Sequence, residues 1–532
     1  MQYRRAMILV FVFALVFVLS GMMIQAQDEG DTLTIGVSYD TPLFDHLRSG
    51  TAPMASYAVF EALVIRNDAG GYDPWVAESW EIAEDGLSVT FVLRDGMTFH
   101  DGTPLNAEAV KWFYDKARDP EGEYTQIASL SPITEVVVVD DLTVRFEFSQ
   151  PFVGFFDVIS TPEFAGLISP TAYEEAGEEF GVSVVVGSGP FQFESWIPSD
   201  VMNLTRYEDY IWGPEAVATN PGPAQVENLV YRVLIEPGTA VAALETGQVD
   251  VLYSVPVRDY PRLQESGNYT FYTTPRFGGA LHYFYFNMDN PAFQDIRVRQ
   301  AINHAVDREG IVAAVYADIG AVPAYNFLPP HFNAAQDNPE SFGQMYNPEM
   351  AAQLLDEAGW VDSDGDGIRD KDGVALNLDV PIINWPDAQD LTQVIQANLQ
   401  EIGIQITVTP VEIARLVELG QSGEFDLLHV LWGWPYADIM MNFAHPDGSF
   451  NFSGYDDEEL RALLDAAMAA PTLEERDAAF GEADLRLTEQ AWVLPVVFPN
   501  DLIAVRNDVE NFSINALGYH NFPTDWDLAA SE

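Results

Sequence analysis

Residues 74–112 of this 532-residue chain read PWVAESWEIAEDGLSVTFVLRDGMTFHDGTPLNAEAVKW. Within this stretch, residues 88–94 alternate apolar and polar side chains, which predicts a half-buried strand that stops at the turn pair Asp95-Gly96. Asn106 is a residue type that caps helix N-termini, so we expect a helix over residues 107–118. The segment therefore predicts a strand, a turn, a loop and a helix in close succession.

The same alternation of strands and helices extends along the rest of the chain. Between residues 376 and 431 the pattern is strand, helix, strand, helix, strand, which is typical of a partly parallel sheet. The two helices are expected over residues 390–402 and 413–419. A chain of 532 residues is too long for one core. We therefore predict an α/β protein with two or three lobes and room for a cleft between them.

The charge of the chain restricts its partners. Acidic residues outnumber basic residues 82 to 24, which gives a net charge of −58. Such a field repels phosphate backbones and anionic lipid headgroups, so we expect no nucleic-acid partner. A solvated acidic coat that keeps the protein soluble is the simplest interpretation, and the same field would steer a cationic ligand inward.

The chain has no cysteine, and its N-terminus has the pattern of an export signal. The absence of cysteine excludes disulfides, thiol nucleophiles and a cysteine-linked lipid anchor. Residues 1–5 carry two arginines, an apolar run covers residues 6–19, and Ala26 offers a small residue for cleavage. We predict a signal peptide over residues 1–26, or an uncleaved N-terminal anchor. The protein is then periplasmic or lies on the outer face of the cell membrane.

Residues 74–112 and four later segments together resemble the family 5 extracellular solute-binding proteins of ABC importers, which include dipeptide- and oligopeptide-binding proteins. The resemblance covers nearly the whole chain after residue 26. The later segments follow the order of the family: VGSGPFQFESW (186–196), NPAFQDIRVRQAINHAVDREGIV (290–312), YNPEMAAQLLDEAGW (346–360) and LQEIGIQITV (399–408).

The resemblance implies an α/β fold of the type II periplasmic-binding-protein kind, with two main lobes, an extra domain and two hinge strands. Lobe I would combine residues 28–60, 190–275 and 490–532, the extra domain residues 61–189, and lobe III residues 276–489. The implied function is to capture peptides in the cleft between the lobes and deliver them to the permease subunits of an ABC importer. The protein would act as a monomer.

The aromatic segment 429–448 is the best candidate for the ligand cleft, because it follows a predicted strand. We expect Trp432, Trp434 and Tyr436 to line it. In peptide-binding relatives, Gly-Trp precedes an aspartate-rich turn whose aspartate pairs with the α-ammonium group. Here Gly433 and Trp434 match, but the first acid is Asp438.

Three interpretations of this loop stay open. Asp438 serves the α-ammonium group of a peptide, or a neutral oligosaccharide stacks on Trp432 and Trp434, or the tryptophans belong to the core. By resemblance, two further segments are expected to reach the cleft. The first contains Ser188 and Gly189, and the second, residues 277–286, contains Phe277 and Tyr283. An extended peptide would be held there by main-chain hydrogen bonds.

The run DSDGDGIRDKDG at residues 362–373 resembles a calcium loop. Asp362, Asp364 and Asp366 stand at its first, third and fifth positions, and Gly367 stands at the sixth. Gly373 occupies the twelfth position, where a bidentate glutamate should close the shell. We therefore weigh a structural calcium site against a polar aspartate-glycine hairpin, and we expect no other cofactor.

The sequence offers little support for an enzyme. It contains no G-x-S-x-G, no H-E-x-x-H and no cysteine nucleophile. We therefore predict a binding protein without catalytic residues. A secreted hydrolase remains as the alternative, because two of the 82 acids could form a glycosidase pair. A signalling or scaffold module that keeps the same fold would have the same apolar pattern.

Overall fold

The computed structural model describes residues 32–40, 43–48, 54–67, 71–119, 130–332, 334–335, 344–433, 436–514 and 522–529. The predicted signal peptide lies outside the described residues. Among the described residues, none of the helices is both long and apolar enough to cross a membrane.

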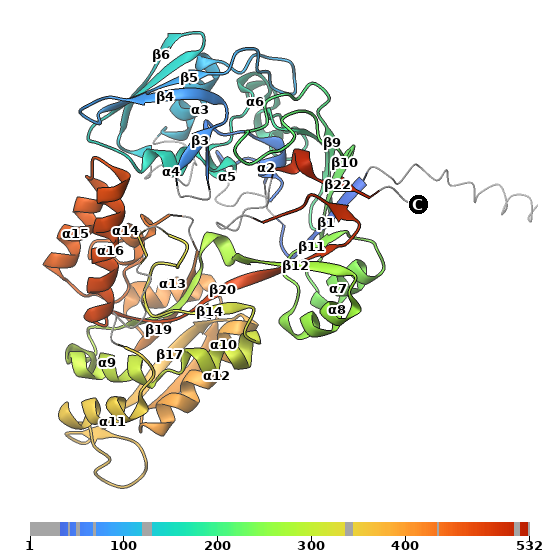
Figure 1. Cartoon of the computed structure of the whole chain (residues 1–532). Helices are drawn as coiled ribbons and strands as arrows, with labels where there is room; N and C mark the ends of the chain where they lie inside the picture. Colours follow the sequence, from blue (N-terminus) through green and yellow to red (C-terminus); the bar gives the residue numbers. More distant parts are fainter. Residues whose placement is uncertain are drawn as a thin grey trace, which may run out of the picture.

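A ten-stranded sheet runs through the molecule and connects its two main lobes (Figure 1). Its main path consists of β19 (Leu427–Trp432), β13 (Leu281–Phe286), β20 (Val493–Arg506), β11 (Val251–Leu252), β1 (Thr32–Val37), β10 (Asn228–Val233), β9 (Val201–Arg206) and β8 (Phe191–Ile197). Two more strands, β12 (Tyr269–Pro275) and β14 (Ala321–Pro323), pair with β20.

Strand β20 belongs to both lobes. Its first half pairs with β13 and β14, with Val497 opposite His282. Its second half pairs with β12 and β11, with Asn500 opposite Pro275. The chain crosses between the lobes a second time where β12 leads through the short turn η5 (Arg276–Gly278) into β13. Two adjacent strand connections therefore join the lobes, which is the geometry of a hinge.

The upper body in Figure 1 is built on the four-stranded sheet β4 (Ala77–Ile82), β5 (Ser88–Leu93), β7 (Thr143–Phe148) and β6 (Ile133–Asp140). Helix α3 (Ala107–Ala117) begins at Asn106, whose side chain accepts a hydrogen bond of 3.1 Å from the Ala109 N–H. The predicted strand, N-cap and helix are therefore confirmed. Short elements surround this sheet: α2 (Ser56–Val59), β2 (Val64–Arg66), β3 (Tyr72–Pro74), α4 (Phe155–Ile159), α5 (Pro162–Ala165) and α6 (Pro170–Ala176).

One apolar core continues from this upper body into the first lobe. It includes Phe91 of the four-stranded sheet, Leu229 of β10 and Trp526 near the C-terminus. A smaller core lies under α7 (Pro237–Glu245) and α8 (Tyr260–Ser266). The domain boundaries stay a prediction, but the upper body and the first lobe share buried side chains.

The lower lobe contains the predicted alternation of strands and helices. Strands β17 (Asn377–Ile383) and β18 (Gln405–Val411) are parallel, and α12 (Pro386–Glu401) connects them. This helix begins four residues earlier than expected, because Pro386 fits the first helical turn. The remaining helices are α9 (Ile296–Ala305), α10 (Arg308–Tyr316), α11 (Pro348–Glu357), α13 (Ile413–Ser422), α14 (Ile439–Phe443), α15 (Glu458–Met468) and α16 (Leu473–Glu489). Two further short antiparallel pairs are the hairpin of β15 (Asp370–Lys371) with β16 (Val374–Ala375), and β21 (Val509–Glu510) with β22 (Asp527–Leu528).

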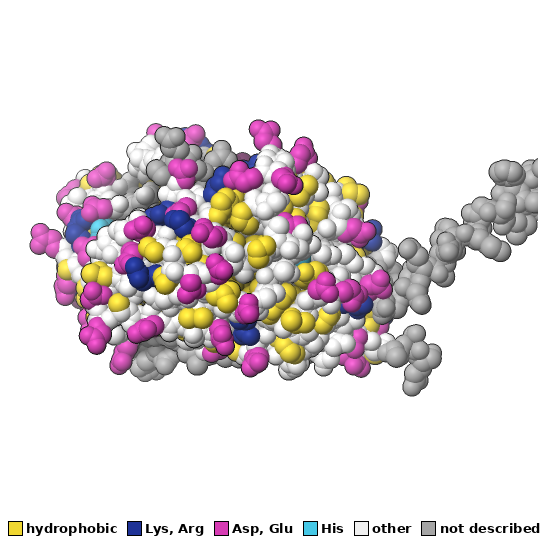
Figure 2. Space-filling model, turned by 90° about the horizontal axis from the view of Figure 1, so that it is seen from above, with side chains coloured by type: hydrophobic (Ala, Val, Ile, Leu, Met, Phe, Trp, Pro, Cys, Tyr) yellow, Lys and Arg dark blue, Asp and Glu magenta, His cyan; other side chains and the backbone are white. Residues whose placement is uncertain are grey.

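Acidic side chains are spread over much of the face seen in Figure 2, among apolar side chains and fewer basic ones. They do not gather in a single patch on this face. This distribution fits the solvated acidic coat that the composition indicates.

Candidate functional site: the boundary between the lobes

A buried ion pair joins the upper body to the lower lobe. Arg476 of α16 lies 2.6 Å from Asp157 of α4, and their side chains are only 5% and 4% exposed. The Tyr72 hydroxyl donates a hydrogen bond of 2.5 Å to the same carboxylate. Burial alone would lower the pKa of Arg476, but the charges of Asp157 and Asp438 raise it above its ordinary value. The arginine therefore stays charged between two acids.

A second contact crosses the boundary nearby. The hydroxyls of Thr161, the N-cap of α5, and Tyr436, in the loop after β19, form a buried hydrogen bond. A small cavity lies at this boundary, lined by residues that include Arg66, Asp157, Tyr436 and Arg476. In this structure the two bodies are thus in direct contact, as expected for a closed form.

A larger hollow lies in the first lobe, beyond the ends of β1 and β10. Val37, Tyr39 and Val233 contribute to its lining. These residues stand at or just after the carboxyl ends of two parallel strands, where α/β sheets commonly bind ligands. Tyr39 keeps 44% of its surface exposed, yet burial and the nearby carboxylates of Glu163 and Asp501 raise the pKa of its hydroxyl. Protein atoms therefore lie around Tyr39, while part of its surface stays open to solvent.

A polar network occupies the hinge. Arg276, in the η5 crossing, lies 3.2 Å from Asp501 of β20 and 2.8 Å from Asp387 of α12. One cation therefore connects both hinge segments to the lower lobe. Although burial opposes ionisation of Asp387, the His282 ring at 3.4 Å and the charge of Arg276 hold its pKa below the usual value.

Two fully buried histidines extend this network. His282 Nδ1 lies 3.0 Å from His429 Nε2, which places β13 and β19 in register through a side-chain hydrogen bond. Burial lowers the pKa of both rings, and His282 lowers that of His429 further. Both rings are therefore neutral at pH 7 and serve as hydrogen-bonding partners.

The predicted aromatic segment lies at this boundary. Trp432 ends β19 and is 40% exposed, and its ring stacks on Phe450 at 5.6 Å. Gly433 follows it, whereas Trp434 lies outside the described residues. Tyr436 is buried against Thr161. Asp438 precedes α14 and lies close enough to Arg476 to influence its charge.

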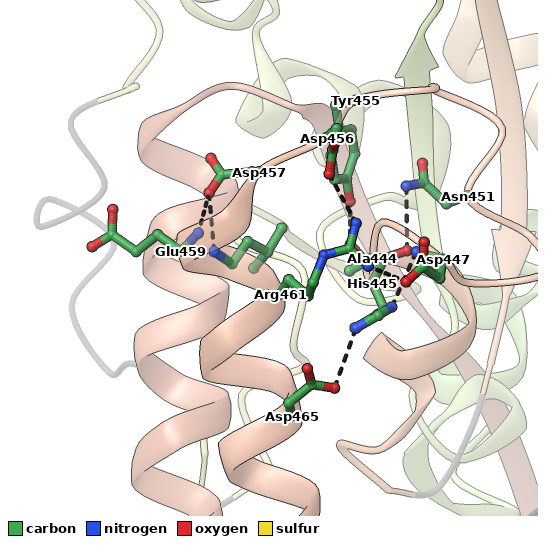
Figure 3. A network of polar contacts seen from close by, with 11 residues as sticks. Ala444, His445, Asp447, Asn451, Tyr455, Asp456, Asp457, Glu459, Arg461 and Asp465 are labelled. Atoms are coloured by element: carbon green, nitrogen blue, oxygen red, sulfur yellow. Dashed lines mark hydrogen bonds and ion pairs between the residues drawn. The ribbon is translucent and has the colours of Figure 1, made fainter.

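A polar network fixes the segment that carries Tyr436 and Asp438 at its C-terminal end (Figure 3). The Tyr455 hydroxyl donates to the Ala444 carbonyl, and Asn451 donates to the His445 carbonyl at 3.3 Å. The His445 ring also lies 3.4 Å from Asp465 of α15. Arg461 contacts both Asp447 and Asp456. The segment is therefore held against α15.

Three of the other predicted ligand residues, Ser188, Gly189 and Tyr283, are packed elsewhere. Ser188 is fully buried, and any side chain at Gly189 would meet the Ala58 carbonyl at 2.6 Å. Tyr283 is 1% exposed, and its hydroxyl donates to that of Tyr285 at 3.1 Å inside the lower lobe. Phe277 belongs to the η5 crossing by its backbone. The contacts described for Ser188, Gly189 and Tyr283 do not involve Tyr436, and contact of all four residues with ligand stays a prediction.

Sequence reasoning missed the charged and hydroxyl residues at the boundary: Asp157, Thr161, Glu163, Arg276, Arg476 and Asp501. Apart from Glu163, these residues have partners from distant parts of the chain, so no local motif marks them. The sequence does indicate that a helix begins at Thr161, because threonine followed by proline is common at the start of a helix.

The three aspartates of the predicted calcium loop do come together. Their carboxylate oxygens lie within 4.8 Å of one another, and all three side chains are exposed. Each carboxylate also accepts backbone N–H groups of the loop, such as Asp362 from Gly365 at 2.7 Å and Asp366 from Ile368 at 2.8 Å. The donor set suits a hard cation, but Gly373 supplies no side-chain ligand in the turn between β15 and β16. A calcium site stays a prediction.

Two lobes that meet at a buried boundary and are joined by two strands define a two-lobed solute-binding protein with an α/β fold. The family model "Bacterial extracellular solute-binding proteins, family 5 Middle" matches residues 71–454. This chain belongs to that family. The resemblance and the fold class predicted from the sequence are therefore confirmed.

Relatives of this chain bind different solutes. The glutathione-binding protein GsiB of Salmonella typhi is 27% identical over 435 residues, which cover 79% of this chain and 80% of that protein. The structure of NikA from Brucella suis in complex with Fe(III)-EDTA is 25% identical, with a TM-score of 0.82, and the match covers 93% of this chain and 99% of that one. The oligopeptide-binding protein AppA of Bacillus subtilis, in complex with a nonapeptide, shares the fold at 24% identity and a TM-score of 0.73, over 94% and 99% of the two chains.

Proposed function

We propose that this chain is the extracytoplasmic binding protein of an ABC importer, and that it captures a peptide between its lobes for delivery to the permease. The observation that carries the proposal is the pair of buried contacts across the boundary, Asp157 with Arg476 and Thr161 with Tyr436, in a molecule with a two-strand hinge. Contacts available only in the shut form stabilise closure around a solute.

A peptide is the favoured solute class because the boundary combines hydrogen-bonding and aromatic groups. GsiB is named for glutathione, and AppA was solved with a nonapeptide. Trp432 and Tyr39 both keep accessible ring surface, which suits the varied side chains of peptides. In this proposal the solute leaves the protein covalently unchanged, and the protein acts as an exported monomer.

An oligosaccharide is the second candidate, on one specific observation. The Trp432 ring is 40% exposed and is supported from behind by Phe443 and Phe450 at 5.0 and 5.6 Å. Such a platform suits stacking of a sugar ring as well as of a peptide side chain.

A thermal-shift and fluorescence screen tests the proposal. The purified chain is partly unfolded, dialysed to remove any bound solute, refolded and incubated with panels of di- to nonapeptides and of neutral oligosaccharides. We expect peptides to raise the melting temperature and change tryptophan fluorescence, because a ligand that binds only the native state stabilises it. Mass spectrometry should recover the peptide intact. Cleaved products would favour a hydrolase, response to sugars alone would favour the second candidate, and no response in either panel would refute both.

A further inference from the structure

Two contacts fix which nitrogen of each buried histidine carries the proton. The backbone N–H of Ile383, in β17, donates to His429 Nδ1 at 3.4 Å. A neutral imidazole has one N–H and one acceptor nitrogen, so the proton of His429 lies on Nε2. His429 Nε2 then donates to His282 Nδ1 at 3.0 Å, and the proton of His282 lies on its own Nε2. The chain of donors therefore has one direction, from β17 towards the hinge.

The hinge end of this chain is the Asp387 carboxylate. His282 Nε2 lies 3.4 Å from Asp387 Oδ2, and it has no hydrogen-bond partner among the described residues. Arg276 Nη1 lies 2.8 Å from the same oxygen. One carboxylate oxygen thus faces two nitrogen donors, and in this structure Arg276 makes the closer contact.

Arg276 also spans the hinge. Asp387 belongs to the lower lobe, whereas Asp501 lies opposite Thr274 in the half of β20 that pairs with β12 of the first lobe. Arg276 Nε lies 3.2 Å from Asp501 while its Nη1 contacts Asp387. A single guanidinium reaches both acids only over a narrow range of hinge angles. The double contact of Arg276, which we call the hinge clamp, is therefore specific to the shut form.

An added proton breaks this arrangement wherever it enters. On His429 it would occupy Nδ1, which faces the Ile383 N–H, and on His282 it would occupy Nδ1, which faces the His429 N–H. A charged His282 would also compete with Arg276 for Asp387 Oδ2. Burial lowers the pKa of both rings, and the charge of Arg276 lowers that of His282 further, against the opposing effect of Asp387. Neutral rings and the hinge clamp therefore favour each other.

Other charges nearby do not remove this competition. The titratable and charged groups around the two rings and the clamp are Asp387 and Asp390 of α12, Arg276 of η5, Asp501 of β20 and Tyr316 of α10. Arg276 is the one cation of this set while both rings are neutral. A proton on His282 adds a second cation, and Asp387 is the carboxylate that it contacts.

We propose that His282 and His429 are positioning residues of an acid-sensitive hinge clamp, which holds the lobes shut while both rings are neutral. When His282 takes up a proton, Asp387 exchanges Arg276 for the His282 cation, and the hinge is released. A solute would then be held at neutral pH and released more readily in acid. The inference goes beyond the proposed function, because it concerns the hinge whichever solute the cleft receives.

Distance measurements across the cleft test the clamp. The chain has no cysteine, so Glu84→Cys and Ala397→Cys provide the only sites for spin labels. Glu84 is exposed in the turn between β4 and β5 of the upper body, and Ala397 is exposed on α12. In refolded, solute-free protein, pulsed electron resonance should show the shut-to-open ratio falling at least about threefold from pH 7.5 to pH 5, since one titrating group changes such a ratio by up to tenfold per pH unit. An unchanged distance distribution overturns the inference.

Variants in the labelled background locate the switch. His282→Gln cannot take up a proton, so its shut-to-open ratio should be the same at both pH values, and Arg276→Gln should be more open than wild type at pH 7.5. His46→Gln is the matched control. His46 is buried against Phe113 of the upper body, 2.8 Å from the Gly166 carbonyl, and burial lowers its pKa to about 4. This variant should keep the wild-type response. An equal response to pH in His282→Gln and wild type overturns the inference.

Nitrogen NMR of wild type labelled at histidine gives a readout that does not depend on how well a variant folds. Both rings should be neutral and carry the proton on Nε2 at pH 7.5. A proton on Nδ1 of either ring at this pH overturns the inference. The outcome is separate from that of the solute screen: a clamp that responds as expected in a protein that binds neither peptides nor oligosaccharides supports the inference and refutes the proposed function.

Discussion

The boundary between the upper body and the rest of the molecule has two regions that differ in charge compensation. Around Arg476, two acids and a tyrosine hydroxyl surround one cation, and the pair with Asp157 is almost fully buried. The Glu163 carboxylate helps to raise the pKa of the half-exposed Tyr39, and it has no cation partner among the described residues. The first region joins the two bodies through a buried ion pair, whereas the second has no compensating cation among the described residues.

The difference follows from the cost of burying charge. A buried ion pair is maintained only where its geometry and hydrogen bonds offset the cost of desolvation. A region whose charges are already paired therefore offers little to a charged ligand. A carboxylate that lacks its partner gains free energy when one arrives. The predictions below test this contrast, from the largest expected effect to the smallest.

Removal of the Arg476 side chain should have the largest effect on stability. Arg476→Ala leaves Asp157 buried without its ion-pair partner, and loss of one member of a buried pair costs about 3–5 kcal/mol. We expect a lower melting temperature and, in X-ray scattering, a more open particle. The control is Arg415→Ala, whose ion pair with Glu418 is 3.0 Å long and at least half exposed, and whose loss should cost no more than about 1 kcal/mol. Equal effects in the two variants would refute a role for Arg476 in holding the lobes.

The pH dependence of cation binding should follow Glu163. The free carboxyl has a pKa of about 7, so it is largely protonated at pH 6 and ionised at pH 8. A cationic solute binds the ionised form, and affinity should therefore rise about tenfold between these pH values. Tyr39, whose pKa is raised by burial and by the charge of Glu163, stays neutral throughout. Calorimetry at both pH values, with Glu163→Gln as the flat reference, checks the sign. A fall in affinity with rising pH would contradict this assignment.

The hydroxyl contact across the lobes should contribute less. Tyr436→Phe removes the hydrogen bond with Thr161 and keeps the ring in place. A hydrogen bond of this kind is worth about 1 kcal/mol, so solute affinity should fall roughly fivefold. Tyr455→Phe is the matched control, because its hydroxyl bonds Ala444 inside the lower lobe. Tyr455→Phe should lower the stability of the protein without selectively weakening solute binding.

The calcium loop should give the smallest effect, because its carboxylates are exposed and already accept backbone N–H groups. If the loop binds calcium, a concentration equal to the dissociation constant stabilises the native state by about 0.4 kcal/mol. Melting curves with calcium and with a chelator measure this. The double variant Asp364→Asn with Asp366→Asn should abolish any rise in melting temperature on addition of calcium. If wild type melts at the same temperature with calcium and with the chelator, the plain hairpin is favoured.

Local sequence patterns predicted much of the fold. The Asn106 cap, the strand before it and the parallel pair β17 and β18 depend on neighbouring residues, so the order of side chains contains the information. The start of α12 was misplaced because Pro386 extends the first turn beyond the apolar pattern.

The site was less accessible to sequence reasoning. Asp157 and Arg476 are far apart in the chain and meet only through the arrangement of whole lobes. Aromatic residues posed a related problem, because Trp432 is exposed while Tyr283 is buried, although both lie in neighbouring strands. Strand β13 is buried on both faces, so its residues show no alternation from which a ligand-facing side could be identified.

Native mass spectrometry of the protein isolated from the producing cell tests most directly whether the lobes enclose a solute. The polypeptide mass measured after denaturation serves as the reference. The account predicts a native mass larger by that of one small molecule, which is released intact on unfolding and restored when peptide is added back. A native mass equal to that of the polypeptide, with no increase after incubation with the peptide and sugar panels, would contradict it.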